Sequence, residues 1–135
     1  MKNAVLDSFA VIAFLRGEAG AEIVKDYFTK SLDEKKRLYI CSVNWAEVAY
    51  KVVRKRGLTA WKQTQAHLKD LPLEIVETDP VLTEQAAEFK AANKMSLADA
   101  YAAALTKIKR AELVTGDPEF KPLEGALKGI VWLKQ

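Results

Sequence analysis

The chain has 135 residues, of which 50% are hydrophobic and 29% charged, and 21 basic against 18 acidic side chains give a formal net charge of +3. This length suits one domain, and the apolar content can form a core without disulfides or a structural metal. One cysteine and one histidine exclude a disulfide scaffold, a cysteine-rich zinc site and a zinc-protease centre. The weak positive charge permits a nucleic-acid partner but does not require one.

Short apolar runs that suit buried strands alternate along the chain with longer stretches whose apolar side chains recur at helical spacing. The runs are continuous, which is typical of parallel strands covered on both faces. We therefore expect a three-layer α/β fold, with a central parallel sheet of four or five strands and helices on both faces. In chain order the predicted elements are strand 4–6, helix 8–16, helix 20–36, strand 38–41, helix 44–56, helix 59–70, strand 73–76, helix 81–93, helix 97–109, strand 112–114 and strand 130–133.

No part of the sequence has the pattern of a targeting or membrane segment. The apolar stretch that ends at Leu15 is interrupted by Asp7 and is too short for a signal sequence, and no run reaches the roughly 18 apolar residues of a spanning helix. The unpaired Cys41 lies in an apolar stretch, which fits a reducing compartment. These features predict a cytoplasmic protein with no membrane partner.

Four acidic residues are expected at one edge of the sheet. Asp7 and Asp117 each come just after a predicted strand, and Glu47 lies in the first turn of the helix that follows another. Asp99 lies in the first turn of the alanine-rich helix 97–109. Because parallel strands end at the same edge of a sheet, where open α/β folds bind their ligands, we expect the four carboxylates to converge there.

Each acid also has a simpler interpretation as a cap or turn residue. Asp7 suits a helix N-cap, 96–99 has the form of a capping box, 44–47 is a looser box with Asn44 as its cap, and 115–118 suits a turn. Capping accounts for each acid singly, but it does not account for four elements that meet at one edge. The sequence leaves both interpretations open.

Converged carboxylates indicate a particular kind of chemistry. They repel one another unless some hold protons or a cation lies between them. Oxygen ligands without histidine or cysteine select Mg²⁺ or Mn²⁺. Such an ion neutralises charge on a phosphodiester and activates water. The acids therefore predict metal-dependent hydrolysis of phosphodiester bonds, with one or two ions.

The same segments resemble the PIN domain, and in particular the VapC-type ribonuclease toxins of prokaryotic toxin–antitoxin pairs. The matching motifs run in order through the chain, at residues 5–8, 44–48, 96–104 and 113–120. The resemblance implies a single PIN-like nuclease domain over residues 1–135. It also implies that the protein hydrolyses RNA with Mg²⁺ or Mn²⁺ as its cofactor.

The resemblance also implies specific site residues and partners. The family's catalytic and metal-binding acids match Asp7, Glu47, Asp99 and Asp117, and its supporting hydroxyl residues match Ser8 and Thr115. The implied partners are a second copy of the chain in a homodimer and a cognate antitoxin whose tail lies in a groove near the acids. Many members carry a further aspartate two residues after the fourth acid. This chain has Glu119 there, which either reaches a metal or caps the turn.

Other functional classes fit less well. Receiver domains and haloacid-dehalogenase-like phosphatases need additional acids close to the first one, and Phe9 stands two residues after Asp7. A catalytically silent PIN-like module that binds RNA or a peptide remains the alternative.

Several basic residues have no assigned role from the sequence. Lys51, Arg54, Lys55 and Arg56 gather at the end of helix 44–56, which is expected to point away from the acids. They suit an RNA backbone or a solvated helix end, where the helix dipole also favours cations. Arg16, at the end of helix 8–16, suits contact with either an antitoxin or RNA.

Overall fold

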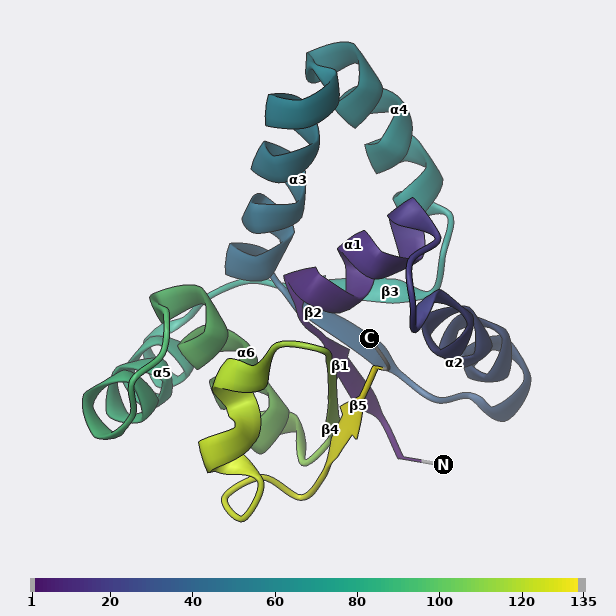
Figure 1. The fold of residues 1–135 in the computed structure, drawn as a ribbon. Coiled ribbons are helices and arrows are strands. Elements are labelled where there is room, and N and C mark those ends of the chain that lie inside the picture. Colours follow the sequence, from purple (N-terminus) through teal and green to yellow (C-terminus); the bar gives the residue numbers. More distant parts are fainter. Residues whose placement is uncertain (1, 134–135) are drawn as a thin grey trace.

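The computed structural model describes residues 2–133, which form a sheet of five parallel strands in the order β3-β2-β1-β4-β5 (Figure 1). The strands are β1 (Ala4–Leu6), β2 (Leu38–Cys41), β3 (Leu73–Val76), β4 (Glu112–Thr115) and β5 (Ile130–Trp132). The helices are α1 (Ser8–Arg16), α2 (Ala21–Glu34), α3 (Ser42–Arg56), α4 (Leu58–Lys69), α5 (Pro80–Ala92), α6 (Leu97–Lys109) and the 3₁₀ helix η1 (Pro118–Leu123). The predicted α/β fold with a central parallel sheet is confirmed.

Two cores form because successive side chains of each strand point to opposite faces of the sheet. In β1, Val5 packs into one core, and Ala4 and Leu6 pack into the other. Helices α5 and α6 and the segment η1 cover the face with Val5, and α1, α2, α3 and α4 supply the opposite core (Figure 1). Since both faces are covered, the central strands β1 and β2 are apolar at every position, whereas the edge strand β3 carries the exposed Glu74.

The helix predicted over 44–56 begins two residues earlier, at Ser42. The last residue of β2, Cys41, has an extended backbone and occupies the N-cap position, so the strand continues into α3 without a loop. Asn44 therefore lies inside the first turn, and the prediction that it caps this helix is wrong. Its buried side chain is free to bond elsewhere.

The topology brings distant parts of the sequence to one edge. β1 lies between β2 and β4, so the segments that leave these three strands emerge beside one another. α1 begins directly after β1, and α3 begins directly after β2. The start of α6 is tied to this edge as well, because the Asn44 amide on α3 donates to the carbonyl of Ala98 at 3.1 Å. Among the described helices, none has the length and apolar content needed to cross a bilayer.

Candidate active site

Asp7 is the most enclosed of the four acids, with only 1% of its surface exposed. It is the N-cap of α1, and its Oδ1 accepts a hydrogen bond of 2.9 Å from the backbone N–H of Ala10. Its Oδ2 accepts a short hydrogen bond from the buried hydroxyl of Thr115, at the end of β4. The same carboxylate therefore caps a helix and joins the ends of two neighbouring strands.

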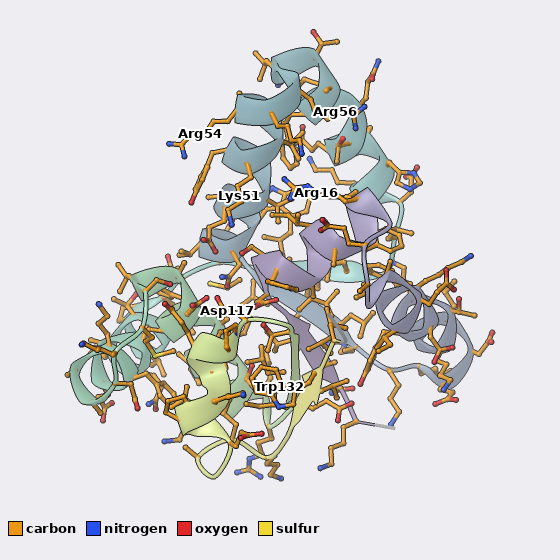
Figure 2. All side chains as sticks on the ribbon, viewed as in Figure 1. Arg16, Lys51, Arg54, Arg56, Asp117 and Trp132 are labelled. Carbon is orange, nitrogen blue, oxygen red and sulfur yellow. The ribbon has the colours of Figure 1, made fainter. Side chains whose placement is uncertain are left out.

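Thr115 connects Asp7 to Asp117. Its hydroxyl donates to Asp7 and accepts the backbone N–H of Asp117 at 3.0 Å. Asp117 in turn caps η1, since its Oδ1 accepts the N–H of Glu119 at 2.9 Å. Figure 2 labels Asp117 near the point where the lower helices approach the start of α3. The hydroxyl of Thr115 thus links the carboxylate of Asp7 to the backbone of Asp117 in one hydrogen-bond network.

Asp99 and Glu119 meet Asp117 at the same place. Carboxylate oxygens of Asp99, Asp117 and Glu119 all lie within 4.8 Å of one another. Asp99 is buried in the first turn of α6, whose N-cap Ser96 accepts its backbone N–H at 3.1 Å. Glu119 also accepts the backbone N–H of Ser96 at 3.3 Å. Glu119 therefore belongs to the acidic cluster, and it holds the start of α6 against η1.

Glu47 borders this cluster and is held by two polar side chains. Its Oε1 accepts the hydroxyl of Ser8 at 2.8 Å and the amide Nδ2 of Asn44 at 3.3 Å. The Asn44 amide also reaches the carbonyl of Ala98, next to Asp99. Sequence reasoning missed this role of Asn44, whose position one turn before Glu47 was read as a cap.

The cap interpretation fails for Asn44 at 44–47, but at the other three segments capping and clustering occur together. Asp7 and Asp117 cap α1 and η1, and Ser96 caps α6. The structure nevertheless brings Asp7, Glu47, Asp99 and Asp117 to one edge of the sheet, with Ser8 and Thr115 bonded to two of them. The tightest triplet contains Glu119 and excludes Asp7 and Glu47. The sequence signal for Glu119 was its spacing two residues after Asp117.

Burial and crowding raise the pKa of two of these acids. The pKa of Asp7 rises to about 7, chiefly because the carboxylate is removed from water, and the nearby charges of Asp117 and Glu47 add to the effect. Hydrogen bonds from Thr115 and Ala10 oppose this rise. The pKa of Asp99 rises to about 8, first through burial and then through a hydrogen bond with Glu119 and the charges around it. Without a cation, the cluster therefore retains protons at neutral pH.

The cluster suits a hard divalent cation, which prefers oxygen ligands. Its donors are carboxylate oxygens, and the one histidine, His67, is exposed on α4. Oxygen donors without imidazole or thiolate favour Mg²⁺, Ca²⁺ or Mn²⁺ over zinc or copper. Asp99, Asp117 and Glu119 would hold such a cation, whose charge would displace the retained protons and offset the repulsion between the carboxylates. The raised pKa values and the donor chemistry therefore support the same kind of ligand.

Replacing Thr115 with valine is expected to raise the pKa of Asp7 further. The variant keeps the side-chain shape but loses the hydroxyl that donates to the carboxylate. A hydrogen bond to a charged group contributes about 1.5–3 kcal/mol, which corresponds to roughly one to two pH units. Carboxyl chemical shifts of the metal-free protein, titrated by NMR, measure this change. Thr115→Ser keeps a hydroxyl and is the control; equal Asp7 titration curves in all three proteins would contradict the assignment.

Comparisons with known proteins give one family match and several structural neighbours. The family model described as PIN domain matches residues 4–125. A toxin–antitoxin complex from Klebsiella pneumoniae contains a similar chain with a TM-score of 0.70 and 21% identity, over 96% of both chains. VapBC2 from Rickettsia felis, solved with a promoter DNA fragment, gives a TM-score of 0.72 at 19% identity, over 97% of this chain and 98% of that one.

A third neighbour is VapC20 from Mycobacterium tuberculosis, described as a toxin that cleaves the sarcin–ricin loop. It gives a TM-score of 0.68 at 19% identity, over 89% of this chain and 94% of that one. No curated protein matches the sequence. At these identities the solved structures show that the fold is shared over nearly the whole length of each chain.

Proposed function

Since this chain belongs to the PIN domain family, we propose that it is an endoribonuclease that hydrolyses RNA with Mg²⁺ or Mn²⁺. The observation that carries the proposal is the meeting of Asp7, Asp99, Asp117 and Glu119, from three separate parts of the chain, in a partly buried cluster whose acids hold protons. Carboxylates that are buried and repel one another at neutral pH are stabilised when a cation binds between them. Solvated acids, which water already stabilises, gain much less from a bound cation.

The residues divide into those that hold a metal and those that position other groups. Asp99, Asp117 and Glu119 are the proposed ligands, with Asp7 beside them. When bound, a Mg²⁺ or Mn²⁺ ion supplies charge neutralisation at the phosphodiester and a bound water of lowered pKa. Thr115 fixes the orientation of Asp7 through its hydroxyl. Ser8 and Asn44 both donate to Oε1 of Glu47, which leaves Oε2 free to orient the attacking water and accept its proton.

The structural neighbours support a biological role. They include the toxin–antitoxin complex from Klebsiella pneumoniae and VapBC-5 from Mycobacterium tuberculosis, which is described as a member of the VapBC family of toxin–antitoxin systems. We propose that this protein is the toxin of such a pair, that it forms a homodimer in the cytoplasm, and that a cognate antitoxin silences it. The alternative is a catalytically silent module, which the complete set of acids disfavours because a binding function does not need buried, mutually repelling carboxylates.

Incubation of the purified protein with cellular RNA tests the proposal. Cleavage is expected when Mg²⁺ or Mn²⁺ is present and is expected to stop when a chelator removes the ion, because no other group in the cluster can neutralise the reacting phosphate. Sequencing of the new RNA ends locates the cut and shows whether one RNA class is preferred. Calorimetry measures whether the metal binds at the acids. Metal binding without RNA cleavage would favour the catalytically silent module.

A further inference from the structure

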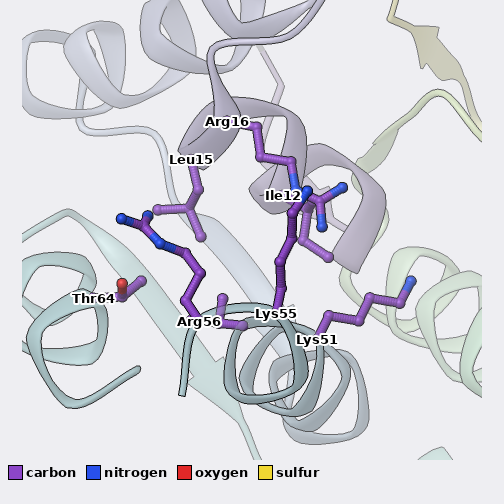
Figure 3. Close-up of a pocket in the computed structure, with 8 residues that line it drawn as sticks. Ile12, Leu15, Arg16, Lys51, Lys55, Arg56 and Thr64 are labelled. Carbon is purple, nitrogen blue, oxygen red and sulfur yellow. The ribbon is translucent and has the colours of Figure 1, made fainter. Parts of the chain in front are cut away.

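A cationic groove lies between α1 and α3, outside the acidic cluster. It contains a cavity of about 100 Å³, seen in Figure 3. Side chains from α1, α3 and α4 line it: Ile12, Leu15, Arg16, Lys51, Val52, Lys55, Arg56 and Thr64. In Figure 3, Arg16 on α1 and Lys55 on α3 extend toward each other, and Arg56 extends toward Leu15 and Thr64.

None of the residues that line this groove is acidic. The lining contains four positive charges and no carboxylate. Within residues 2–133 the ion pair that forms is Lys30 with Asp26, on α2. Glu18 borders a neighbouring cavity with Arg16 but makes no ion pair with it. Like charges gathered without a partner produce a strong local positive potential, so the groove attracts an anion.

The groove starts at the proposed active site. Ser8 on α1 donates to Glu47 on α3, so the two helices are in contact at the acids. One turn further along each helix lie Ile12 and Lys51, and these line the groove. Glu47, Lys51 and Lys55 are spaced four residues apart, so they form a stripe along one side of α3 with steps of about 6 Å. In Figure 2, Lys51 and Arg16 lie between Asp117 and Arg56, which stands at the far end of α3.

We infer that this groove binds the phosphodiester backbone of the RNA strand beside the bond that is cut. The inference rests on the proposed nuclease function and adds a substrate-binding site to it. Arg16, Lys51, Lys55 and Arg56 pair with successive phosphates while a neighbouring phosphate lies at the acids. The apolar side chains Ile12, Leu15 and Val52 form the floor and give no base-specific contact, so this contact favours RNA of any sequence.

An acidic protein segment is the other polyanion that such a groove attracts, and two observations favour RNA. Lys51 and Lys55 continue along α3 from Glu47. An RNA strand that has one phosphate at the acids needs cations placed in this way for its next phosphates. The cavity of about 100 Å³ is also well below the roughly 300 Å³ of the smaller ligand pockets, so it suits a phosphate group better than a bulky anchoring side chain.

The chain provides a matched control for the test. Arg54 and Arg56 lie on the same helix and are both exposed, but Arg56 lines the groove and Arg54 instead stacks on the ring of Tyr50 at 4.8 Å. Figure 2 shows the two on opposite sides of α3. Arg56→Gln and Arg54→Gln therefore remove the same charge from the same helix, with only one of them in the groove. The triple variant Arg16→Gln/Lys55→Gln/Arg56→Gln removes three groove cations.

Fluorescence anisotropy with a labelled single-stranded RNA, in chelator and over a range of salt concentrations, measures binding without cleavage. Each phosphate contact to a single strand contributes about 0.7 to the slope of log affinity against log salt. The triple variant is expected to lose about 2 from this slope and Arg56→Gln about 0.7, with Arg54→Gln unchanged. Thermal unfolding confirms that the variants fold. In Mg²⁺, the triple variant is expected to raise KM for RNA and leave kcat unchanged.

The outcomes separate the two proposals. Equal slopes and KM values for the wild type, Arg54→Gln and the triple variant overturn the groove inference while nuclease activity persists. Absence of metal-dependent cleavage by the wild type overturns the nuclease function, and the binding slopes are still measured. A labelled polyglutamate peptide is the third probe. If the triple variant loses the peptide but keeps the RNA affinity and slope, the groove binds an acidic protein segment and the inference is wrong.

Discussion

Asp7→Asn is expected to reduce RNA cleavage by roughly a thousandfold while the protein stays folded. Asparagine cannot supply the negative charge that this site offers to a cation, and the metal provides several kcal/mol of transition-state stabilisation. The fold survives because asparagine is as good an N-cap as aspartate and can still accept the N–H of Ala10. Metal-free stability at about pH 8 should rise, since a buried charge has been removed. Single-turnover cleavage rates and urea unfolding measure the two effects.

Asp79→Asn is the matched control for this variant. Asp79 caps α5 in the way that Asp7 caps α1, with its Oδ1 accepting the N–H of Leu82 at 2.8 Å, but it is exposed and takes no part in the cluster. It should change neither the cleavage rate nor the pH dependence of stability. A fully active Asp7→Asn protein, or an equal loss in both variants, would show that Asp7 has only a capping role.

The metal-free protein is expected to lose stability as the pH rises from about 4 to about 8. The pKa of Asp7 (about 7) and that of Asp99 (about 8) in the folded state both exceed the ordinary value of 3.8. Between these values the folded state binds more protons than the unfolded state, so the free energy of unfolding falls with increasing pH. The penalty is absent below about pH 4 and complete above about pH 8, and it amounts to several kcal/mol.

Added Mg²⁺ or Mn²⁺ should reverse this loss at high pH. A ligand that binds only the folded state stabilises it by about 2.7 kcal/mol at a concentration one hundred times its Kd. The effect should be greatest at about pH 8–9, where the carboxylates no longer hold protons that compete with the metal. Urea unfolding with and without the ion, at several pH values, measures both parts. A metal-free stability that is flat or rises over this range would mean that Asp7 and Asp99 are ordinary surface acids.

Much of the fold follows from local sequence patterns. The five strands were predicted because their apolar runs are short and continuous, and the observed β1, β2 and β3 have the predicted bounds. Helices α1 and α6 also have the predicted bounds, and α2, α3, α4 and α5 differ from prediction by one or two residues at their ends. The helix expected over 20–36 is Ala21–Glu34, since Gly20 and Lys35 both adopt left-handed backbone conformations, with φ of 94° and 55°. Such ends depend on single dihedral angles that periodicity does not specify.

Convergence of the acids could also be predicted, because it depends only on where each residue stands relative to a strand. In a parallel sheet the strand ends share an edge, so a residue just after β1 and one just after β4 are neighbours whatever their side chains. From the sequence alone, that argument predicts that Asp7 and Asp117 lie close together. It did not include Glu119, whose place beside Asp99 depends on the turn that η1 makes after Asp117.

The sequence by itself determined the alternation of strands and helices, and therefore the parallel sheet and the edge that carries the acids, because these depend on periodicity and chain order. Only the tertiary structure decided which side chains touch: the bonds from Asn44 and Ser8 to Glu47, and the groove that Arg16 shares with Lys55. Such contacts join residues far apart in the chain and depend on helix rotation and side-chain length. The burial that raises the pKa of Asp7 and Asp99 is likewise a property of the packed neighbours, which no single segment contains.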